Sequence, residues 1–312
     1  MIPGLRVGHA ADPVGLTGVT VLLPDSAAVG GVEVRGRAAG VHGLEFLDPH
    51  HLVPTVDGVV LAGGSAFGLE AIWGVMQWLE ERGRGFPTRQ AVVPHVAGAI
   101  LYDLGVGAGR ARPDRAMGYA AAAAARHGEI AQGNVGAGIG ATVGKLHGGE
   151  RAMRGGLGWS AADLGAAAIG AMVAVNAVGD VRDPETGRLI AGARDAADGR
   201  RLVDTAAALA AGVPPPAFQP VNTTIGAVVT SAALGKAEAS ALARLAMRGF
   251  SRALSPPHLD TDGDTLFCLS LGPARCNLDL LGEAAAEAVA RAIVSAVLSA
   301  TSLPGLPAAR DL

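Results

Sequence analysis

Continuous apolar runs, rather than alternating ones, mark the strands that the sequence predicts. Each run is rich in Val, Ile, Leu or Ala, and glycines cluster at the ends of the runs. Strands without an exposed polar face are typical of sheets that are covered on both sides. The predicted strands lie at 18–24, 58–65, 165–176, 223–232 and 266–271, and a further buried segment lies at 91–105.

Apolar residues at helical spacing predict helices between these strands, and three of the helices end at Gly83, Gly128 or Gly212. The predicted helices are 66–83, 114–128, 193–212, 235–254 and 281–300. The stretch "VPPPAFQP" at 213–220 can form neither a helix nor a central strand, because proline lacks an amide donor. Strands and helices therefore mix along one domain, 1–312, which a single long loop near 211–222 interrupts.

The composition predicts a large core and gives no sign of a membrane or nucleic-acid partner. Half of the residues are apolar, and the formal net charge is −3. No apolar stretch is long and uncharged enough to span a membrane, and the start "MIPGLRVGHA" lacks a secretion signal, so we expect a cytoplasmic protein. Cys268, Cys276 and the eight histidines show no disulfide framework and no metal-ligand spacing, so no metal site is expected.

Lysine is rare in a chain that uses arginine for almost every positive charge. Of 25 basic residues only Lys145 and Lys236 are lysine. Lysine differs from arginine because burial lowers its pKa readily, so that it can give up a proton near neutral pH. A lysine in such an arginine-rich chain is therefore a candidate for a chemical role.

The glycine-rich stretch 133–145 suggests nucleotide binding only superficially. A P-loop would need glycine where Ile139 stands and a hydroxyl where Leu146 stands. The segment "GAGIGA" at 136–141 approximates a dinucleotide motif, but no clear strand precedes it and no acidic residue follows at the required distance. The alternative that we favour is that these glycines let backbone segments pack closely.

Three carboxylates cluster in "HLDTDGDTLF" at 258–267, namely Asp260, Asp262 and Asp264. They resemble half of a calcium loop, but the closing glutamate is absent. A solvated turn is the plain alternative. The functional alternative is that Asp262 and Asp264, two residues apart at the start of a strand, point to one side and orient a nucleophile or its ammonium group.

The joint between the proline-rich loop and the next strand holds Asn222, Thr223 and Thr224. A hydroxyl at such a joint can attack the preceding carbonyl, and hydrolysis of the resulting ester frees a new chain end. The new residue then carries a hydroxyl and an α-amine, whose ordinary pKa of about 7.7–8.0 suits a general base. Inert loops also precede strands, so the residues alone leave this open, and either threonine could serve.

Seven motifs, in order, resemble the self-cleaving L-aminopeptidase/D-esterase (DmpA-like) family, which includes β-peptidyl aminopeptidases and nylon-oligomer hydrolases. The resemblance covers nearly the whole chain. The motifs are "GLRVGHA", "VDGVVLAGGSAFGLEA", "PHVAGAILYDLG", "GNVGAGIGATVGK", "VNAVGDV", "NTTIGAVVTSA" and "DTDGDTLF". The resemblance implies an α+β fold, a four-layer α/β/β/α sandwich of the DmpA/ornithine-acetyltransferase-like type.

The same resemblance implies a role for each matching residue. The scissile bond would be Asn222–Thr223, with Thr223 as the N-terminal nucleophile and fragments 1–222 and 223–312. The other implied residues are Lys145 beside the nucleophile, Asn176 and Tyr102 as oxyanion donors, and Asp262 and Asp264 as the pair that orients the nucleophile and its amine. Classical aminopeptidase members use serine as the nucleophile, so a threonine with two aspartates is closer to the nylon-oligomer hydrolase branch and to uncharacterised bacterial relatives.

We therefore expect an autoprocessing hydrolase of peptide, amide or ester bonds that needs no cofactor. Its partners would be small substrates and further copies of itself, since the resemblance favours a tetramer of processed heterodimers. Two alternatives remain. A related fold transfers acetyl groups between amino acids, which would make the protein an acyltransferase, and a relative that never cleaves would be a binding or scaffold protein.

Overall fold

Two five-stranded sheets form the centre of the computed structural model, which describes residues 2–214 and 222–312. The first sheet has the order β1-β2-β5-β8-β4 and the second has the order β11-β12-β15-β17-β3. The strands of the first are β1 (Leu5–Asp12), β2 (Thr17–Pro24), β5 (Gly58–Ala62), β8 (Val96–Ile100) and β4 (Val41–His42). Those of the second are β11 (Gly156–Asp163), β12 (Ala168–Val175), β15 (Ile225–Ala232), β17 (Gly263–Ala274) and β3 (Val29–Gly36).

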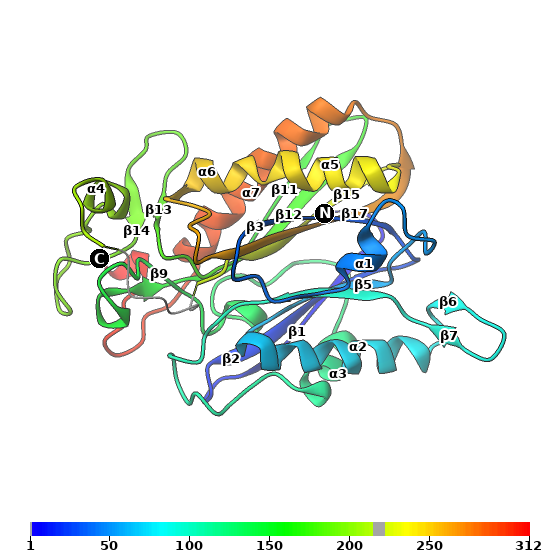
Figure 1. Ribbon diagram of the computed structural model, residues 1–312, viewed down its shortest axis with the longest axis horizontal. Helices are drawn as coiled ribbons and strands as arrows, with labels where there is room; N and C mark the ends of the chain where they lie inside the picture. Colours follow the sequence, from blue (N-terminus) through cyan, green and yellow to red (C-terminus); the bar gives the residue numbers. More distant parts are fainter. Residues whose placement is uncertain (1, 215–221) are drawn as a thin grey trace.

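Helices cover the outer face of each sheet, so that the molecule has four layers (Figure 1). The helices α2 (Ala71–Glu80) and α3 (Arg115–Ala123) pack on the first sheet, and α5 (Lys236–Ala246), α6 (Arg248–Ala253) and α7 (Leu278–Leu298) on the second. Apolar side chains from both sheets meet between them and form a third core. The α/β/β/α sandwich that the sequence predicted is therefore confirmed.

Shorter elements gather mainly at one end of the sandwich, where β9, β14, α4 and the C-terminus lie together in Figure 1. They include β9 (Thr142–Val143), β10 (Met153–Arg154), β13 (Asp180–Arg182), β14 (Leu189–Ala191), β16 (Leu254–Ser255) and α4 (Thr205–Ala210). The 3-10 turns are η1 (Ser65–Glu70), η2 (Gly136–Gly138), η3 (Gly149–Arg151) and η4 (Ala309–Asp311). Elsewhere lie α1 (Leu44–Leu47), β6 (Phe86–Pro87) and β7 (Val92–Val93).

The continuous apolar runs are strands with both faces buried, as expected, since every residue of β2 and β5 is buried. Three predictions about element bounds are wrong. The strand expected over 266–271 is longer, because β17 begins at Gly263 and ends at Ala274, and the helix 235–254 is interrupted at Met247. Most of the helix expected over 193–212 is also missing, because only Thr205–Ala210 is helical. The centre of the loop predicted near 211–222 lies outside the described residues.

The parallel pairing of β15 with β17 sets the geometry of the site. Ile225 pairs with Thr265, and the amide of Thr265 donates to the carbonyl of Thr224 at 3.1 Å. Because parallel strands begin at the same edge of a sheet, the segments before β15 and β17 lie side by side. The residues 222–224 and the acidic turn before β17 therefore meet, although 40 residues separate them.

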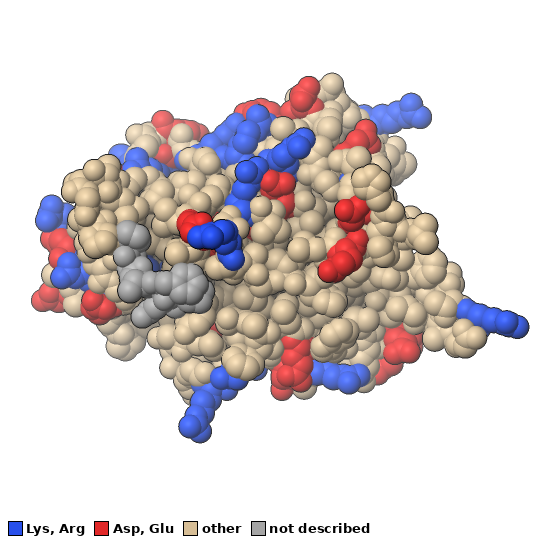
Figure 2. Space-filling view, in the orientation of Figure 1, with Lys and Arg blue, Asp and Glu red and all other residues tan. Residues whose placement is uncertain are grey.

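Positively and negatively charged side chains are interspersed on the surface. Figure 2 shows lysine and arginine interspersed with aspartate and glutamate across one face. Within the described part of the chain, no helix is long and apolar enough to cross a membrane. Among the same residues, no group of three or more His, Cys, Asp or Glu side chains is placed to hold a metal ion.

Candidate active site

The predicted nucleophile lies buried at the entrance to β15, directly beside the end of β12. The amide of Thr223 donates to the carbonyl oxygen of Asn176 at 3.1 Å. The hydroxyl of Thr223 donates to the carbonyl oxygen of Asn222, the residue before it. This contact holds the hydroxyl next to the carbonyl group that a self-cleaving threonine would attack.

Lys145 reaches the same carbonyl oxygen from another segment. Its Nζ donates to the main-chain oxygen of Asn176 at 3.1 Å and to the side-chain oxygen Oδ1 at 2.9 Å. Thr223 N and Lys145 Nζ each lie 3.1 Å from the carbonyl oxygen of Asn176. The distance between these two nitrogen atoms therefore cannot exceed twice that value. Lys145 and Thr223 therefore lie close together.

The backbone at Lys145 depends on a glycine that no other residue replaces easily. Gly144 has φ +73°, and a Cβ there would come within 1.9 Å of the Gly192 backbone. The amides of Gly144 and Lys145 donate to the carbonyls of Gly179 and Val178 at 3.0 and 2.9 Å. The glycine-rich stretch thus packs closely against its neighbours and directs Lys145 inward.

Burial makes Lys145 a weak cation. It lowers the pKa of the Lys145 ammonium to about 7, while the carboxylates of Asp262 and Asp103 oppose this shift. An amine with this pKa exchanges protons at neutral pH. Lys236, by contrast, donates to the carbonyls of His51 and Val53 near the surface, away from this network.

Asn176 connects the nucleophile to the wall of a cavity. Its Oδ1 accepts from the amide of Thr142 at 3.0 Å, and its Nδ2 donates to the main-chain carbonyl of Tyr102 at 3.1 Å. Tyr102 therefore contacts Asn176 through its backbone, whereas the prediction assigned a role to its side chain. Tyr102, Thr142 and Lys145 all line the same cavity, which has a volume of about 800 Å³.

The two predicted aspartates are both buried but have different surroundings. Asp264 accepts from the amide of Thr224 at 2.8 Å and from the ring Nδ1 of His258 at 2.9 Å. Asp262 accepts from the amide of Leu259 at 2.8 Å, while its Oδ1 has no hydrogen-bond partner among the described residues. Burial, followed by the charge of Asp264, raises the pKa of Asp262 to about 7.

Three polar residues at this site were not predicted from the sequence, namely Asp103, Thr142 and His258. Asp103 accepts from the Thr17 hydroxyl and the Gly64 amide, each at 2.7 Å, and burial raises its pKa. It directly follows Tyr102 in "ILYDL", and a charged residue at the end of such an apolar run is the signal that could have revealed it. Thr142 and His258 have no comparable local signal.

Two alternatives from the sequence do not survive. The stretch 136–141 forms the 3-10 turn η2 followed by β9, not the strand–turn–helix that a dinucleotide site requires. Asp260 is exposed and pairs with Arg37, so it does not converge with Asp262 and Asp264 as calcium ligands would.

Relatives at the level of sequence cover the whole chain. The model of peptidase family S58 matches residues 2–310. An uncharacterized aminopeptidase of Mycobacterium tuberculosis is 39% identical, with 100% of this chain and 96% of the relative covered. The 6-aminohexanoate-oligomer endohydrolase of Kocuria sp. is 36% identical, with 86% of this chain and 73% of the relative covered.

Solved structures agree on the fold. A β-aminopeptidase from Burkholderia sp. matches with a TM-score of 0.68 and 23% identity, over 97% of this chain and 86% of that chain. The L-aminopeptidase D-Ala-esterase/amidase from Ochrobactrum anthropi is described as a variant of the Ntn hydrolase fold. It matches with a TM-score of 0.72 and 19% identity, over 98% of this chain and 87% of that chain. The resemblance found in the sequence is confirmed: this chain belongs to peptidase family S58 and is a hydrolase that acts on amide bonds.

Proposed function

We propose that this hydrolase is made as an inactive single-domain precursor, 1–312, that cuts its own backbone between Asn222 and Thr223. The products are fragments 1–222 and 223–312, and the new N-terminal Thr223 is the nucleophile for substrates. The observation that carries this proposal is the contact of the Thr223 hydroxyl with the Asn222 carbonyl oxygen, beside a lysine whose pKa is about 7.

In the cleavage step, Oγ1 of Thr223 attacks the carbonyl carbon of Asn222. The amine of Lys145 takes up the hydroxyl proton and passes it to the nitrogen of residue 223, which leaves as the free α-amine, so that an ester replaces the amide. Water then hydrolyses the ester, which frees the hydroxyl of Thr223 and the carboxylate of Asn222. No bond in this sequence needs an external reagent other than water.

Thr223 fits the role of nucleophile better than its neighbour Thr224. The Thr224 hydroxyl faces the amide of Asn176 at 3.4 Å, and the Thr224 amide donates to Asp264 at 2.8 Å. Thr224 is thus held between two strands as part of the scaffold. Among the described residues, its hydroxyl makes no hydrogen bond with the carbonyl of the residue before it, unlike that of Thr223.

In the processed enzyme, the α-amine of Thr223 takes the proton of its own hydroxyl as the hydroxyl attacks the substrate carbonyl. The Nδ2 of Asn176 and the hydroxyl of Tyr102 would donate to the oxyanion, and one such donor is typically worth about 3 kcal/mol of barrier. Asp262 and Asp264 would orient the nucleophile and its amine. The acyl-enzyme ester is then hydrolysed by water.

We infer that the substrates are short peptides or linear amides, since the relatives named above include an aminopeptidase and an oligomer endohydrolase. The homotetramer expected from the sequence belongs to this proposal as well. The cavity beside Lys145 provides the room for an acyl group.

Intact-mass analysis of purified wild-type protein and the Thr223→Val variant tests the cut and its position together. Valine keeps the shape of threonine but lacks the hydroxyl, so the variant is expected to stay whole while the wild type yields fragments 1–222 and 223–312. Thr223→Ser, which keeps a hydroxyl, is the matched control and is expected to cleave. Cleavage of Thr223→Val before residue 223 would refute the assignment.

A further inference from the structure

His258 has a backbone conformation that a residue with a side chain rarely adopts. It lies in the turn before β17 and has φ +54°, in the left-handed region that favours glycine. Apart from glycines, only Leu16 and Ser65 share this region in the described part of the chain. Such a conformation persists only where contacts on several sides fix it, so the contacts of His258 indicate its role.

The ring of His258 is held on one face and along one edge. Its face stacks on Phe250 of α6, a fully buried core residue, with ring centroids 5.4 Å apart and planes inclined by 28°. At its edge, Nδ1 lies 2.9 Å from Oδ2 of Asp264, and the His258 amide donates to the same oxygen at 3.3 Å. Because a carboxylate oxygen accepts hydrogen bonds, we assign the ring proton to Nδ1.

Asp264 joins this turn to the segment that carries Thr223. Its Oδ1 accepts from the amide of Thr224 at 2.8 Å, while its Oδ2 faces His258. Thr224 directly follows Thr223, and its carbonyl accepts from the amide of Thr265 at 3.1 Å. A shift of the Asp264 carboxylate would therefore move the start of β15 and, with it, the Thr223 hydroxyl.

Asp264 is the charged partner that the ring of His258 has in the described ranges. On α6, which packs against the ring through Phe250, Arg248 and Arg252 both pair with a glutamate of α7. In the turn itself, the Oδ2 of the neighbouring aspartate accepts from a main-chain amide. The ring therefore has one carboxylate to hold, and both oxygens of that carboxylate are bonded.

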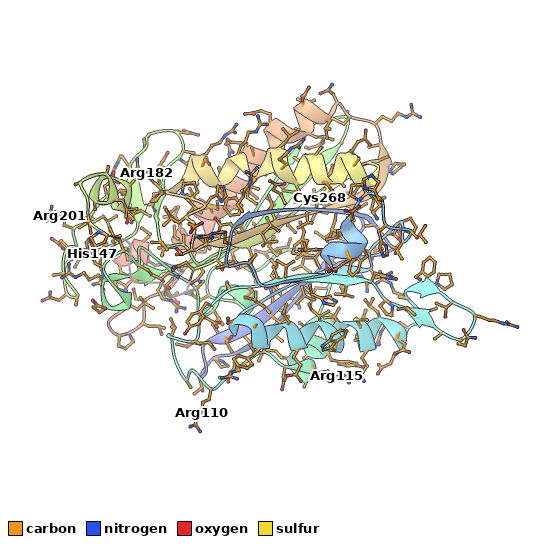
Figure 3. All side chains as sticks on the ribbon, in the orientation of Figure 1. Arg110, Arg115, His147, Arg182, Arg201 and Cys268 are labelled. Atoms are coloured by element: carbon orange, nitrogen blue, oxygen red, sulfur yellow. The ribbon has the colours of Figure 1, made fainter. Side chains whose placement is uncertain are left out.

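The turn that carries His258 connects two parts of the molecule. It follows β16, which pairs with β13, and leads into β17 of the central sheet. In Figure 3, Arg182 of β13 lies at the left among the short elements, and Cys268 of β17 lies nearer to the centre. A contact that fixes this turn therefore sets the position at which β17 begins.

We propose that His258 is a positioning residue for both self-cleavage and amide hydrolysis. Its ring holds the Asp264 carboxylate, and Asp264 in turn holds Thr223 where the hydroxyl can attack. This inference rests on the proposed role of Thr223 as the nucleophile. His258 is not among the residues that line the cavity, so it acts through Asp264 rather than on the substrate.

Two substitutions that both permit the left-handed backbone test this inference. Asparagine adopts this conformation more readily than most residues, and its Nδ2 lies the same number of bonds from Cα as Nδ1 of histidine. Glycine permits the same φ but has no donor. Intact-mass analysis over time measures self-cleavage, which His258→Gly is expected to slow by about 10- to 100-fold and His258→Asn by less than about threefold.

The matched control is His50→Gly, at a histidine whose side chain is 95% exposed, and its rate of self-cleavage should equal that of the wild type. A wild-type rate in His258→Gly would overturn the role of His258. Equal losses in His258→Gly and His258→Asn would also overturn it, because the donor to Asp264 would then have no effect.

A comparison of kcat with KM separates positioning from substrate binding. In the processed fraction of each variant, His258→Gly should lower kcat for alanine para-nitroanilide, while KM stays within about twofold. His258→Asn should again recover most of the wild-type kcat. A rise in KM at unchanged kcat would overturn the positioning role, because it would place His258 in contact with the substrate.

A spectroscopic measurement keeps this inference separate from the proposed nucleophile. If the wild type is neither cut nor active, the proposed function fails, and nitrogen–proton correlation NMR of the histidine rings in Thr223→Val still tests the contact with Asp264. The signal of His258, assigned by its loss when His258→Asn is added, should show a proton on Nδ1. A ring whose Nδ1 carries no proton would refute the hydrogen bond and, with it, the role of His258.

Discussion

Asp180 and Asp262 are both buried aspartates with a raised pKa, yet their surroundings differ. Asp180 accepts from the amides of Thr205 at 2.6 Å and Ala193 at 2.9 Å and from the Thr205 hydroxyl at 2.8 Å. Asp262 accepts a hydrogen bond from the amide of Leu259, and its Oδ1 has no partner in the described part of the chain. Burial is the largest cause of the shift in both, to about 6 and about 7.

The difference shows that a shifted pKa does not by itself mark a reacting group. Asp180 holds the segment 193–205 in place, and each of its oxygens has a partner. Asp262 lies beside a second carboxylate and a buried lysine, and one of its oxygens is left over. Satisfied hydrogen bonds indicate a structural role, whereas an unsatisfied buried oxygen next to other titratable groups indicates a chemical one.

Asp262→Asn should lower the hydrolytic activity far more than Asp180→Asn. Asparagine keeps the shape of the side chain but cannot take up a proton, so we expect hydrolysis of a small amide to slow by about 10²-fold. Thermal stability should stay the same or rise, because the substitution removes a charge beside Asp264. Initial rates and thermal melts on the same preparation measure both, and a wild-type rate would contradict the assigned role.

Asp180→Asn should show the opposite pattern. One amide group cannot accept all three hydrogen bonds that the carboxylate accepts, so the free energy of unfolding should fall by about 1–3 kcal/mol. Processing and hydrolysis should continue below the melting temperature. Denaturant titration measures the loss, and a rate that fell as far as in Asp262→Asn would refute a purely structural role.

The pH dependence of stability should sharpen the comparison further. Both aspartates keep a proton in the folded state at pH values where the unfolded chain, with an ordinary pKa of about 3.9, has lost it. Stability from these protons is therefore present below about pH 4 and is lost as the pH rises through about 6 for Asp180 and about 7 for Asp262.

Each proton contributes a slope of up to about 1.4 kcal/mol per pH unit. Asp180→Asn should flatten the decline between about pH 4 and 6, and Asp262→Asn should flatten it up to about pH 7. Denaturant titrations at each pH should use the uncut Thr223→Val variant as the parent, because a single polypeptide then unfolds rather than two fragments. Identical slopes in both variants and in the parent would show that the two carboxylates ionise alike in the folded and unfolded chains.

Much of the fold follows from local pattern, because buried strands and amphipathic helices have distinct periods. The strands β1, β3 and β11 were not predicted, since each is an edge strand with mixed burial. The segment 193–212 has helical composition, but Asp180 binds amides at Ala193 and Thr205, and this distant carboxylate replaces helical hydrogen bonds. No window of local sequence contains that contact.

The residues of the candidate site also fall into two groups: those that local motifs mark, and those that only long-range contacts reveal. Family motifs mark Thr223, Lys145 and Asn176, and the structure brings these three together at one carbonyl oxygen. Asp103 and His258 were missed because their roles come from contacts with side chains that motifs do not record, such as the bond of Asp103 to Thr17, 86 residues away. Long-range pairing of polar groups leaves no periodic trace in the chain.

The strand that follows Thr223 runs between β12 and β17, with hydrogen bonds to a neighbour on each side. A break just before such a strand severs the polypeptide without freeing either piece. The two products of the proposed cut should therefore elute together as one particle from a sizing column and separate only in denaturant. Since the two pieces supply adjacent strands of one sheet, neither should refold alone.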